Sequence, residues 1–473
     1  MSFRLLLLVA VAAVALPLPA AGQTYVRRGD PVREGRTWVE TIECGTPVAE
    51  GGRLVLRADV GAVAVKTGAE RQLTCLVRLR AYASDEQEAR LILSRYDITL
   101  SATNEQTVQL RGRWGAGTPP APPAPPAPRP GSRVQSPRAP MPPLPPPGAA
   151  RLKVEYEVRV PTRFNLELET RGGEISVERL QGELRAVTAG GSIRTDDISG
   201  PVRAETAGGS IVLGNIGNRV EARTAGGAVR VGDVQGDAIL ETSGGEIIAG
   251  RITGGGRAAT AGGDILLRAA GGDLTVVTAG GQIRLGEVGG RVRAETAGGS
   301  IQLDSARGPV QVETAGGCIN LDRVDTAVRA ATVAGKIRAQ ITASRESFAN
   351  SVLETAFGDV EVYLPTDLPI TIDAVIQNAS GHSIVSDFPL QIDKGGPGVR
   401  SRVIEGRGAL NGGGQVLRIR TTAGNIEIRR LDTRQLEQLE EKQNSLWKRW
   451  LLIRKSREKD KDKNSEKPNP DER

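Results

Sequence analysis

The chain has 473 residues and a formal net charge of +7, and 39% of its residues are hydrophobic but only 3% aromatic. Basic and acidic residues alternate along the chain instead of gathering in a stripe, which argues against a nucleic-acid partner. One histidine and three cysteines argue against a histidine-based catalytic triad or a zinc site. We therefore expect no catalytic residue, no metal and no cofactor.

The first 22 residues have the order of a secretory signal. Arg4 precedes an apolar run from Leu5 to about Leu18, and small residues follow up to Gly22. Because this run is shorter than the roughly 20 residues of a membrane-spanning helix, we expect cleavage after Gly22 rather than retention. The exported chain is then expected in the periplasm, at the outer membrane or on the cell surface.

Residues 23–117 alternate apolar and polar side chains in short runs, which predicts irregular β coils. The segment from Ser84 to Ser94 has acidic residues in its first turn, so a short helix is expected there. Cys44 and Cys75 lie in this region of an exported chain, where a disulfide can persist. The sequence leaves open whether they are bonded, and Cys318 would stay unpaired.

Residues 118–148 are rich in proline, which cannot donate the hydrogen bonds of a β ladder. This composition predicts a disordered, solvated loop between two coils. Binding of a polyproline-reading partner is the alternative use of the same segment.

From Thr170 to Thr332 a Thr-x-Gly-Gly motif returns every 18 residues, degenerate in its last copy. This period is too short for a helical repeat or a propeller blade, so residues 150–340 are predicted to form a parallel β-solenoid of 18-residue coils. With Thr as position zero, positions +5 and +7 are mostly Ile, Leu or Val and flank a variable residue, as in a strand with one buried face. Position +14 is mostly Val or Leu and position +16 usually Ala or Val, so this second strand is also expected to bury one face. By the same parity, the Thr side chains are expected to point into the core.

Glycine is expected at both turns of each coil because it adopts positive φ without strain. Charged residues of both signs, such as Arg203, Glu221 and Arg223, occupy outward positions and are expected to pair between coils. Calcium-binding β-roll repeats share the glycine pairs but need recurring aspartates, which the isolated Asp264 and Asp273 do not supply.

Residues 341–430 keep the alternation but lose the period, which predicts irregular coils that close the solenoid. His382 lies among them and is expected to be an ordinary loop residue. A groove lined by clustered Asp, Arg and Lys in residues 340–415 would instead indicate an enzyme that acts on carbohydrates.

Residues 432–455 have the pattern of an amphipathic helix, and residues 456–473 that of a charged, disordered tail. The helix could lie on an anionic membrane surface, cover the open end of the solenoid or pair with another subunit. The residues expected to contact a membrane or partner are Trp447, Lys448, Arg449, Trp450, Arg454 and Lys455.

Four sequence segments follow one another in a fixed order: Val158-Arg-Val-Pro161, the Thr-x-Gly-Gly-x-Ile array, Val362-Tyr-Leu-Pro365 and Thr422-Ala-Gly-Asn-Ile-Glu-Ile428. Together they resemble the bacterial putative-adhesin β-strand-repeat family, a domain of unknown function, over about residues 150–430. The resemblance implies a β-solenoid protein of the cell envelope and carries over no site residue.

Three functional hypotheses follow. The first is a non-catalytic, adhesin-like binding or scaffold protein whose partner is an envelope protein or a polysaccharide, and which could form homo-oligomers. The second is an envelope-linked carbohydrate-active enzyme. The third is a membrane-associated envelope sensor or regulator that acts through the helix at 432–455.

Overall fold

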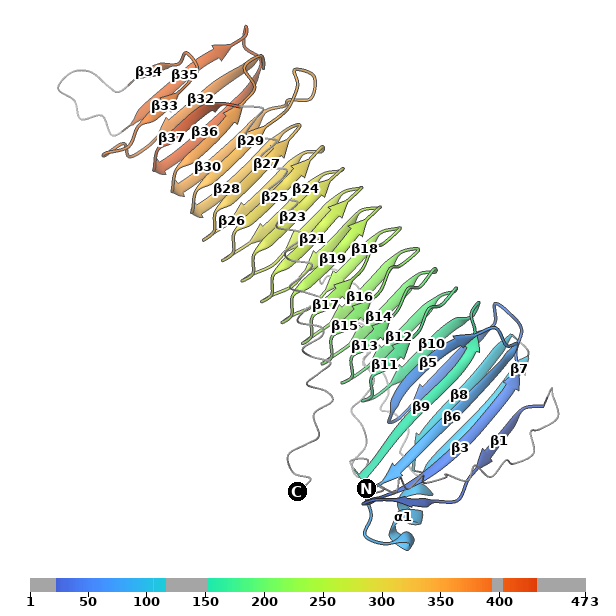
Figure 1. Cartoon of the computed structure of the whole chain (residues 1–473). Coiled ribbons are helices and arrows are strands. Elements are labelled where there is room, and N and C mark those ends of the chain that lie inside the picture. Colours follow the sequence, from blue (N-terminus) through green and yellow to red (C-terminus); the bar gives the residue numbers. More distant parts are fainter. Residues whose placement is uncertain (1–22, 105, 116–150, 394–402, 432–473) are drawn as a thin grey trace, which may run out of the picture. The chain divides into compact units, whose positions relative to one another are not determined.

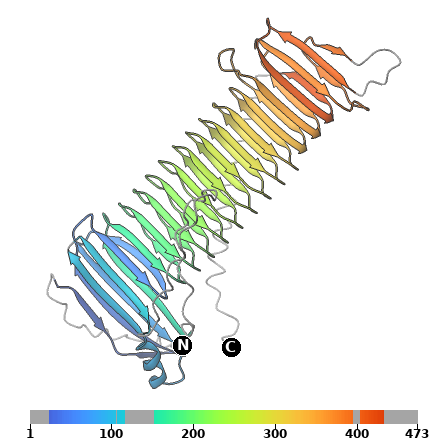
Figure 2. The same cartoon turned by 180° about the vertical axis from the view of Figure 1, so that it is seen from behind.

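The computed structural model describes residues 23–104, 106–115, 151–393 and 403–431. They divide into unit 1 (described residues up to 200, and 204–206) and unit 2 (201–203, and 207 onward). Both units consist almost entirely of β strands, stacked in parallel over most of their coils (Figure 1 and Figure 2), which confirms the predicted all-β solenoid. The segments expected as signal peptide, proline-rich loop, C-terminal helix and charged tail lie outside the described residues.

Each regular coil of unit 2 contributes one strand to each of two parallel sheets. Pairing is in register at the 18-residue period, so that Ile265 lies opposite Ile283 and Val292 opposite Val310. The first sheet contains β15 (Ile211–Leu213), β17 (Val229–Val231), β19 (Ile247–Ile252), β21 (Ile265–Ala270), β23 (Ile283–Val288), β25 (Ile301–Ala306), β27 (Ile319–Val324), β29 (Ile337–Ile341), β31 (Val360–Leu364), β33 (Ile384–Ser386) and β37 (Ile426–Arg430). The second contains β16 (Val220–Thr224), β18 (Ala238–Glu241), β20 (Gly256–Ala259), β22 (Leu274–Val277), β24 (Val292–Thr296), β26 (Val310–Thr314), β28 (Val328–Ala334), β30 (Ser351–Phe357), β32 (Ile370–Ile376), β34 (Gln391–Asp393), β35 (Ile404–Leu410) and β36 (Gln415–Ala423). In this second sheet β35 is the exception, since it pairs antiparallel with β32 and β34.

The core holds one more inward column than the sequence predicted. Besides positions +5, +7, +14, +16 and the Thr, position +10 is buried in each coil, as at Ile216, Val234 and Ile252. These three residues form isolated parallel bridges, and from β19 onward the strand itself extends over this position. Burying about six side chains per coil outweighs the roughly 0.5–1 kcal/mol that each glycine costs.

The Thr column points inward as predicted, and its hydroxyls join successive coils. The Oγ1 atom of each Thr donates to the carbonyl oxygen of the second motif glycine one coil earlier, at 2.8–3.0 Å from Thr206 to Thr332. The same oxygen accepts the N–H of the second glycine of its own motif, for example 3.2 Å from Gly281 N to Thr278 Oγ1. The Thr-x-Gly-Gly motif is thus one unit of a buried series of hydrogen bonds, which we call the hydroxyl ladder.

The reason expected for the paired glycines is wrong. None of the repeat glycines has a φ in the left-handed region. A Cβ atom added at Gly281 would instead lie 1.9 Å from the carbonyl oxygen of Gly263, whereas one at Gly280 would lie 3.6 Å from its nearest neighbour, Gly262 O. Only the second glycine of the motif is therefore required, because backbone from the adjacent coil approaches it closely.

Unit 1 combines regular coils with longer strands that run antiparallel. β3 pairs antiparallel with β6, and β6 with β9, so the expectation of irregular coils throughout 23–117 holds only for part of that range. The predicted helix is confirmed as α1 (Glu86–Leu93), with Asp85 as its N-cap. The strands are β1 (Tyr25–Arg28), β2 (Val32–Glu34), β3 (Thr37–Pro47), β4 (Arg53–Ala58), β5 (Ala62–Gly68), β6 (Gln72–Ala81), β7 (Tyr96–Asn104), β8 (Thr107–Trp114), β9 (Leu152–Pro161), β10 (Asn165–Thr170), β11 (Ile175–Val177), β12 (Leu184–Thr188) and β13 (Ile193–Thr195), and β14 (Val202–Thr206) falls at the division between the units.

Near each end of the chain, one coil lies between two coils that are not its neighbours in sequence. In unit 2, β36 pairs with both β30 and β32, and β37 pairs with both β31 and β33. In unit 1, β4 lies between β8 and β10, and β5 between β9 and β11. The hydroxyl ladder follows this spatial order, since Thr170 donates to Gly61 O and Thr421 to Gly358 O.

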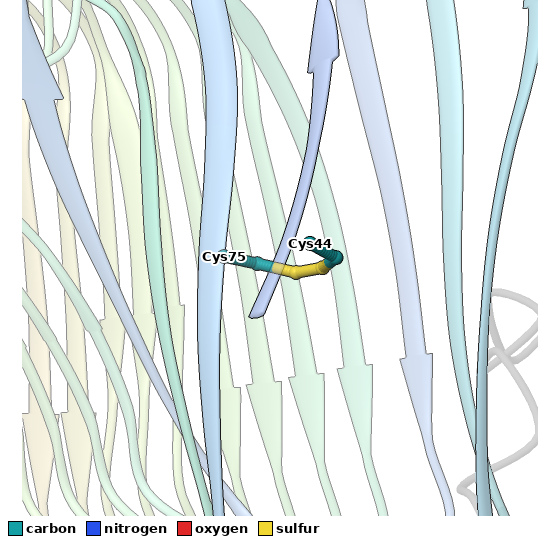
Figure 3. Close-up of a disulfide and its surroundings, with 2 residues drawn as sticks. All are labelled: Cys44 and Cys75. Carbon is teal, nitrogen blue, oxygen red and sulfur yellow. A yellow bond between two sulfur atoms is a disulfide. The ribbon is translucent and has the colours of Figure 1, made fainter. Parts of the chain in front are cut away.

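A disulfide joins Cys44 to Cys75 across the β3–β6 pair (Figure 3). The two residues lie directly opposite each other, with Cα atoms 5.0 Å apart, and both are buried. Cys318 is exposed and unpaired.

Candidate functional site

Unit 2 carries a hollow of about 580 Å³ on the bend between positions +9 and +11 of five successive coils, which we call the coil groove. Because neighbouring strands lie about 4.8 Å apart, five coils span about 19 Å. Its small residues are Ala269, Ala270, Gly271, Gly289 and Ser305, and its polar and charged residues are Arg251, Thr253, Glu287, Arg307, Arg323 and Asp325.

The groove exists because small residues alternate with large charged ones in register at position +9, and because two glycines, Gly271 and Gly289, follow each other at position +11. Arg251 lies opposite Ala269, Ala269 opposite Glu287, and Glu287 opposite Ser305. At position +11, a Cβ atom at Gly271 would lie 2.1 Å from the carbonyl oxygen of Thr253. The floor at this point therefore cannot be filled without moving the backbone.

The charged residues of the groove are held by rigid strands. The backbone N–H of Arg251 donates to Asp233 Oδ1 at 2.8 Å. Asp325 accepts a hydrogen bond from Thr342 Oγ1 at 2.5 Å, and its own N–H donates to Ala306 O at 3.1 Å. The backbone at Arg251 and the carboxylate of Asp325 are thus held in place, and the arginine side chains extend from this fixed frame.

The predicted charge columns pair between coils, as expected. In unit 2, Glu221 pairs with Arg203 at 3.5 Å and also with Arg223. Arg223 pairs in turn with Glu241 at 2.9 Å, and Glu241 with Arg257 at 3.7 Å. The Arg223 and Glu221 side chains are each only 16% exposed, so this network stabilises the stack more than isolated surface pairs would.

Unit 1 has a smaller hollow of about 240 Å³, which we call the arginine pocket. It lies where the adjacent parallel strands β8, β4 and β10 end. Its lining comprises Arg57, Ala58, Asp59, Arg111, Gly112, Arg113, Glu169 and Arg171.

Two buried tyrosines fix the wall of the arginine pocket. The hydroxyls of Tyr96 and Tyr156 lie 2.6 Å apart, and that of Tyr96 donates to Val60 O at 2.9 Å. Burial raises the pKa of both phenols, so they stay neutral. A Cβ atom at Gly112 would lie 1.7 Å from the Tyr156 hydroxyl, which explains why glycine separates Arg111 from Arg113.

Several sequence predictions have definite outcomes. Asp264 and Asp273 each accept a backbone N–H from the next coil, at 2.7 and 2.8 Å, which is a structural role. The His382 N–H donates to Ala379 O at 3.2 Å within a turn. Within the described ranges, no group of three or more His, Cys, Asp or Glu side chains could hold a metal ion. The membrane or partner residues predicted from Trp447 to Lys455 lie outside those ranges.

The cluster that the enzyme hypothesis requires is present in composition but not in geometry. Asp373 lies within 4.0 Å of three guanidinium groups, at 3.6 Å from Arg407, 3.5 Å from Arg418 and 4.0 Å from Arg420. These residues come from the adjacent strands β35, β32 and β36, on one face of the second sheet. Glycoside hydrolysis needs two carboxyl groups on opposite sides of the scissile bond, whereas the carboxylates of Asp373 and Glu405 lie on one face and both pair with Arg407, at 3.6 and 2.9 Å.

In the part of the chain that the structure describes, no helix is long and apolar enough to cross a membrane. No protein-family model matches the chain, and no curated protein sequence matches it.

Three solved structures show a weak likeness. A putative adhesin from Bacteroides fragilis is 13% identical, covers 59% of this chain and 97% of its own, and has a TM-score of 0.26. A putative cell adhesion protein from Clostridium sporogenes is 10% identical, with coverage of 82% and 99% and a TM-score of 0.12. A putative lipid binding protein from Parabacteroides distasonis is 9% identical, with coverage of 69% and 97% and a TM-score of 0.19. TM-scores this low support no inference about function.

Proposed function

We propose that the chain is an exported, non-catalytic protein of the cell envelope, and that unit 2 binds an extended polar partner along the coil groove. The observation that supports this most is the groove itself, about 580 Å³ in volume and lined by three arginines and two carboxylates. Charged side chains of both signs, distributed over four of the five coils, provide many modest contacts with a long ligand. An envelope polysaccharide or an extended envelope protein has the required length.

Binding of the chain from Gln23 onward to purified envelope polysaccharides and outer-membrane vesicles tests this function. The variant Arg251→Glu/Arg307→Glu reverses two charges of the groove. The matched control Arg284→Glu/Arg291→Glu reverses two charges on the same stretch of solenoid outside the groove. We expect the groove variant to weaken binding at least about tenfold and the control to leave it unchanged. Equal binding by both variants, or no binding by the unaltered chain, would refute the proposal.

The location of the protein separates adhesion from internal scaffolding. Protease treatment of intact cells should cleave the protein if it is an adhesin on the surface. Protection until the outer membrane is permeabilised would place it in the periplasm, and adhesion would then have to be abandoned in favour of a scaffold.

A further inference from the structure

The arginine pocket holds more positive charge than its own carboxylates neutralise. Asp59 pairs with Arg171 at 3.2 Å, and Glu169 pairs with Arg57 at 3.6 Å. Four guanidinium groups therefore share the pocket with two carboxylates. The remaining two cations face a concave surface that is open to solvent.

The two remaining cations are Arg111 and Arg113. Among the residues that the structure describes, no carboxylate lies within the 4.0 Å ion-pair distance of Arg111 or Arg113. The Arg111 guanidinium donates to the neutral Gln109 side chain at 3.1 Å. Asp97 lies opposite Arg113 in the β7–β8 pair, but its carboxylate does not reach that distance.

The pairing of the strands places like charges together. Arg57 lies opposite Arg111 where β4 and β8 pair in register, and like charges in that position destabilise a sheet. Elsewhere in the same sheet an opposite-sign pair is found, with Glu167 opposite Arg185. The same sheet also places Glu295 opposite Glu313, so the like-charge pairing supports a binding role through its combination with two arginines that have no carboxylate nearby among the described residues.

We infer that the arginine pocket binds a single tetrahedral oxyanion group, a sulfate or phosphate, carried by a ligand from solvent. Arginine presents several N–H donors in a planar fork that matches such oxygens. The volume of about 240 Å³ is below the usual range of about 300–1,000 Å³ for drug-sized ligands, which suits one charged group and not a whole molecule. The site is preorganised, because Asp59 Oδ2 accepts a hydrogen bond from the backbone N–H of Trp114 at 3.0 Å. The paired hydroxyls of Tyr96 and Tyr156 also fix the backbone at Gly112. This inference does not depend on the coil groove, which lies in unit 2.

Equilibrium dialysis of the chain from Gln23 onward with labelled sulfate tests the pocket directly. Unlabelled phosphate and acetate serve as tetrahedral and planar competitors. Three variants are compared: Arg113→Gln removes an unpaired cation, Glu169→Gln removes a carboxylate, and Arg185→Gln removes an exposed arginine of the same sheet that does not line the pocket. Thermal unfolding of each variant shows whether it is folded.

The inference predicts effects of opposite sign. Sulfate should bind one site per chain, Arg113→Gln should weaken it about tenfold or more, and Glu169→Gln should strengthen it several-fold. Arg185→Gln should leave it unchanged, and phosphate should compete better than acetate. The inference would be overturned by absence of saturable sulfate binding, by equal affinities in all variants, or by acetate competing as well as phosphate.

Discussion

The hydroxyl ladder predicts that a buried threonine cannot be replaced by its apolar isostere. Thr278 Oγ1 donates to Gly263 O at 3.0 Å and accepts from Gly281 N at 3.2 Å, and the side chain is 3% exposed. Thr278→Val keeps the shape but leaves a buried N–H without its partner and removes the hydroxyl bond of a carbonyl. Each such loss costs about 1–3 kcal/mol, so we expect about 2–6 kcal/mol of destabilisation in total.

Two further variants separate the hydroxyl from the methyl group and from general effects of the substitution. Thr278→Ser keeps both hydrogen bonds and loses one methyl group, for a cost of about 1 kcal/mol. Thr275→Val changes an outward-facing threonine of the same coil and should alter stability by no more than about 0.5 kcal/mol.

Urea unfolding followed by circular dichroism gives the free energies of unfolding, and hydrogen exchange locates the effect. Exchange of the Gly281 amide should accelerate most in Thr278→Val. If Thr278→Val proved as stable as Thr278→Ser, the hydrogen bonds of the hydroxyl ladder would not contribute to stability, and the prediction would be wrong.

Three other predictions address the turn, the disulfide and the helix. Gly281→Ala should destabilise unit 2 by about 3 kcal/mol or more, because the new Cβ atom would collide with the backbone of Gly263 in the preceding coil. Gly280→Ala should be tolerated, and thermal unfolding of the two variants measures the difference. Cys75→Ser opens a loop of 31 residues and should cost unit 1 up to about 4 kcal/mol, measured by hydrogen exchange in β3 and β6. Hydrogen bonds from the Ser84 N–H and from Arg151 lower the pKa of Glu88 from 4.5 to about 2. The ionised Glu88 carboxylate therefore stabilises α1 above pH 4.5, and this contribution is lost as the pH falls toward 2. Glu88→Gln should loosen α1 at pH 7 but not at pH 2.

Each of these three has a result that would contradict it. Equal melting temperatures for the two glycine variants would mean that the coils can separate to admit a methyl group. A change in β22 or β24 on loss of the disulfide would mean that the effect is not confined to unit 1. A Glu88 carboxyl that titrates near 4.5 in an NMR experiment would remove the basis of the pH prediction.

The regular coils were predictable because their determinants are local. The 18-residue period, the buried apolar positions and the inward Thr all follow from alternation within a single coil. The partners of the Thr hydroxyl and the role of the glycines both depend on how closely the next coil approaches, and the reason predicted for the glycines was therefore wrong. The extra column at +10 was missed because the bend at +8 and +9 shifts the parity.

The two hollows could not be predicted in the same way. The coil groove has a weak signal in the sequence, since small residues recur at +9 and +11 in consecutive repeats at Ala269, Gly271 and Gly289. The arginine pocket has none, because Arg57, Arg113 and Glu169 meet only when β4 takes its place between β8 and β10. Pairing between segments that are distant in the chain is set by tertiary packing and produces no repeating pattern in the amino-acid sequence.

The coil formed by β36 and β37 constrains the order in which unit 2 can be completed during synthesis. These strands leave the ribosome after β30–β33, yet their place is between β30–β31 and β32–β33. Until they arrive, β30 and β32 present edges that could pair with each other in a wrong register. A chain cut short before residue 415 would therefore lose an internal layer of unit 2 and leave β32 and β33 without their parallel neighbours.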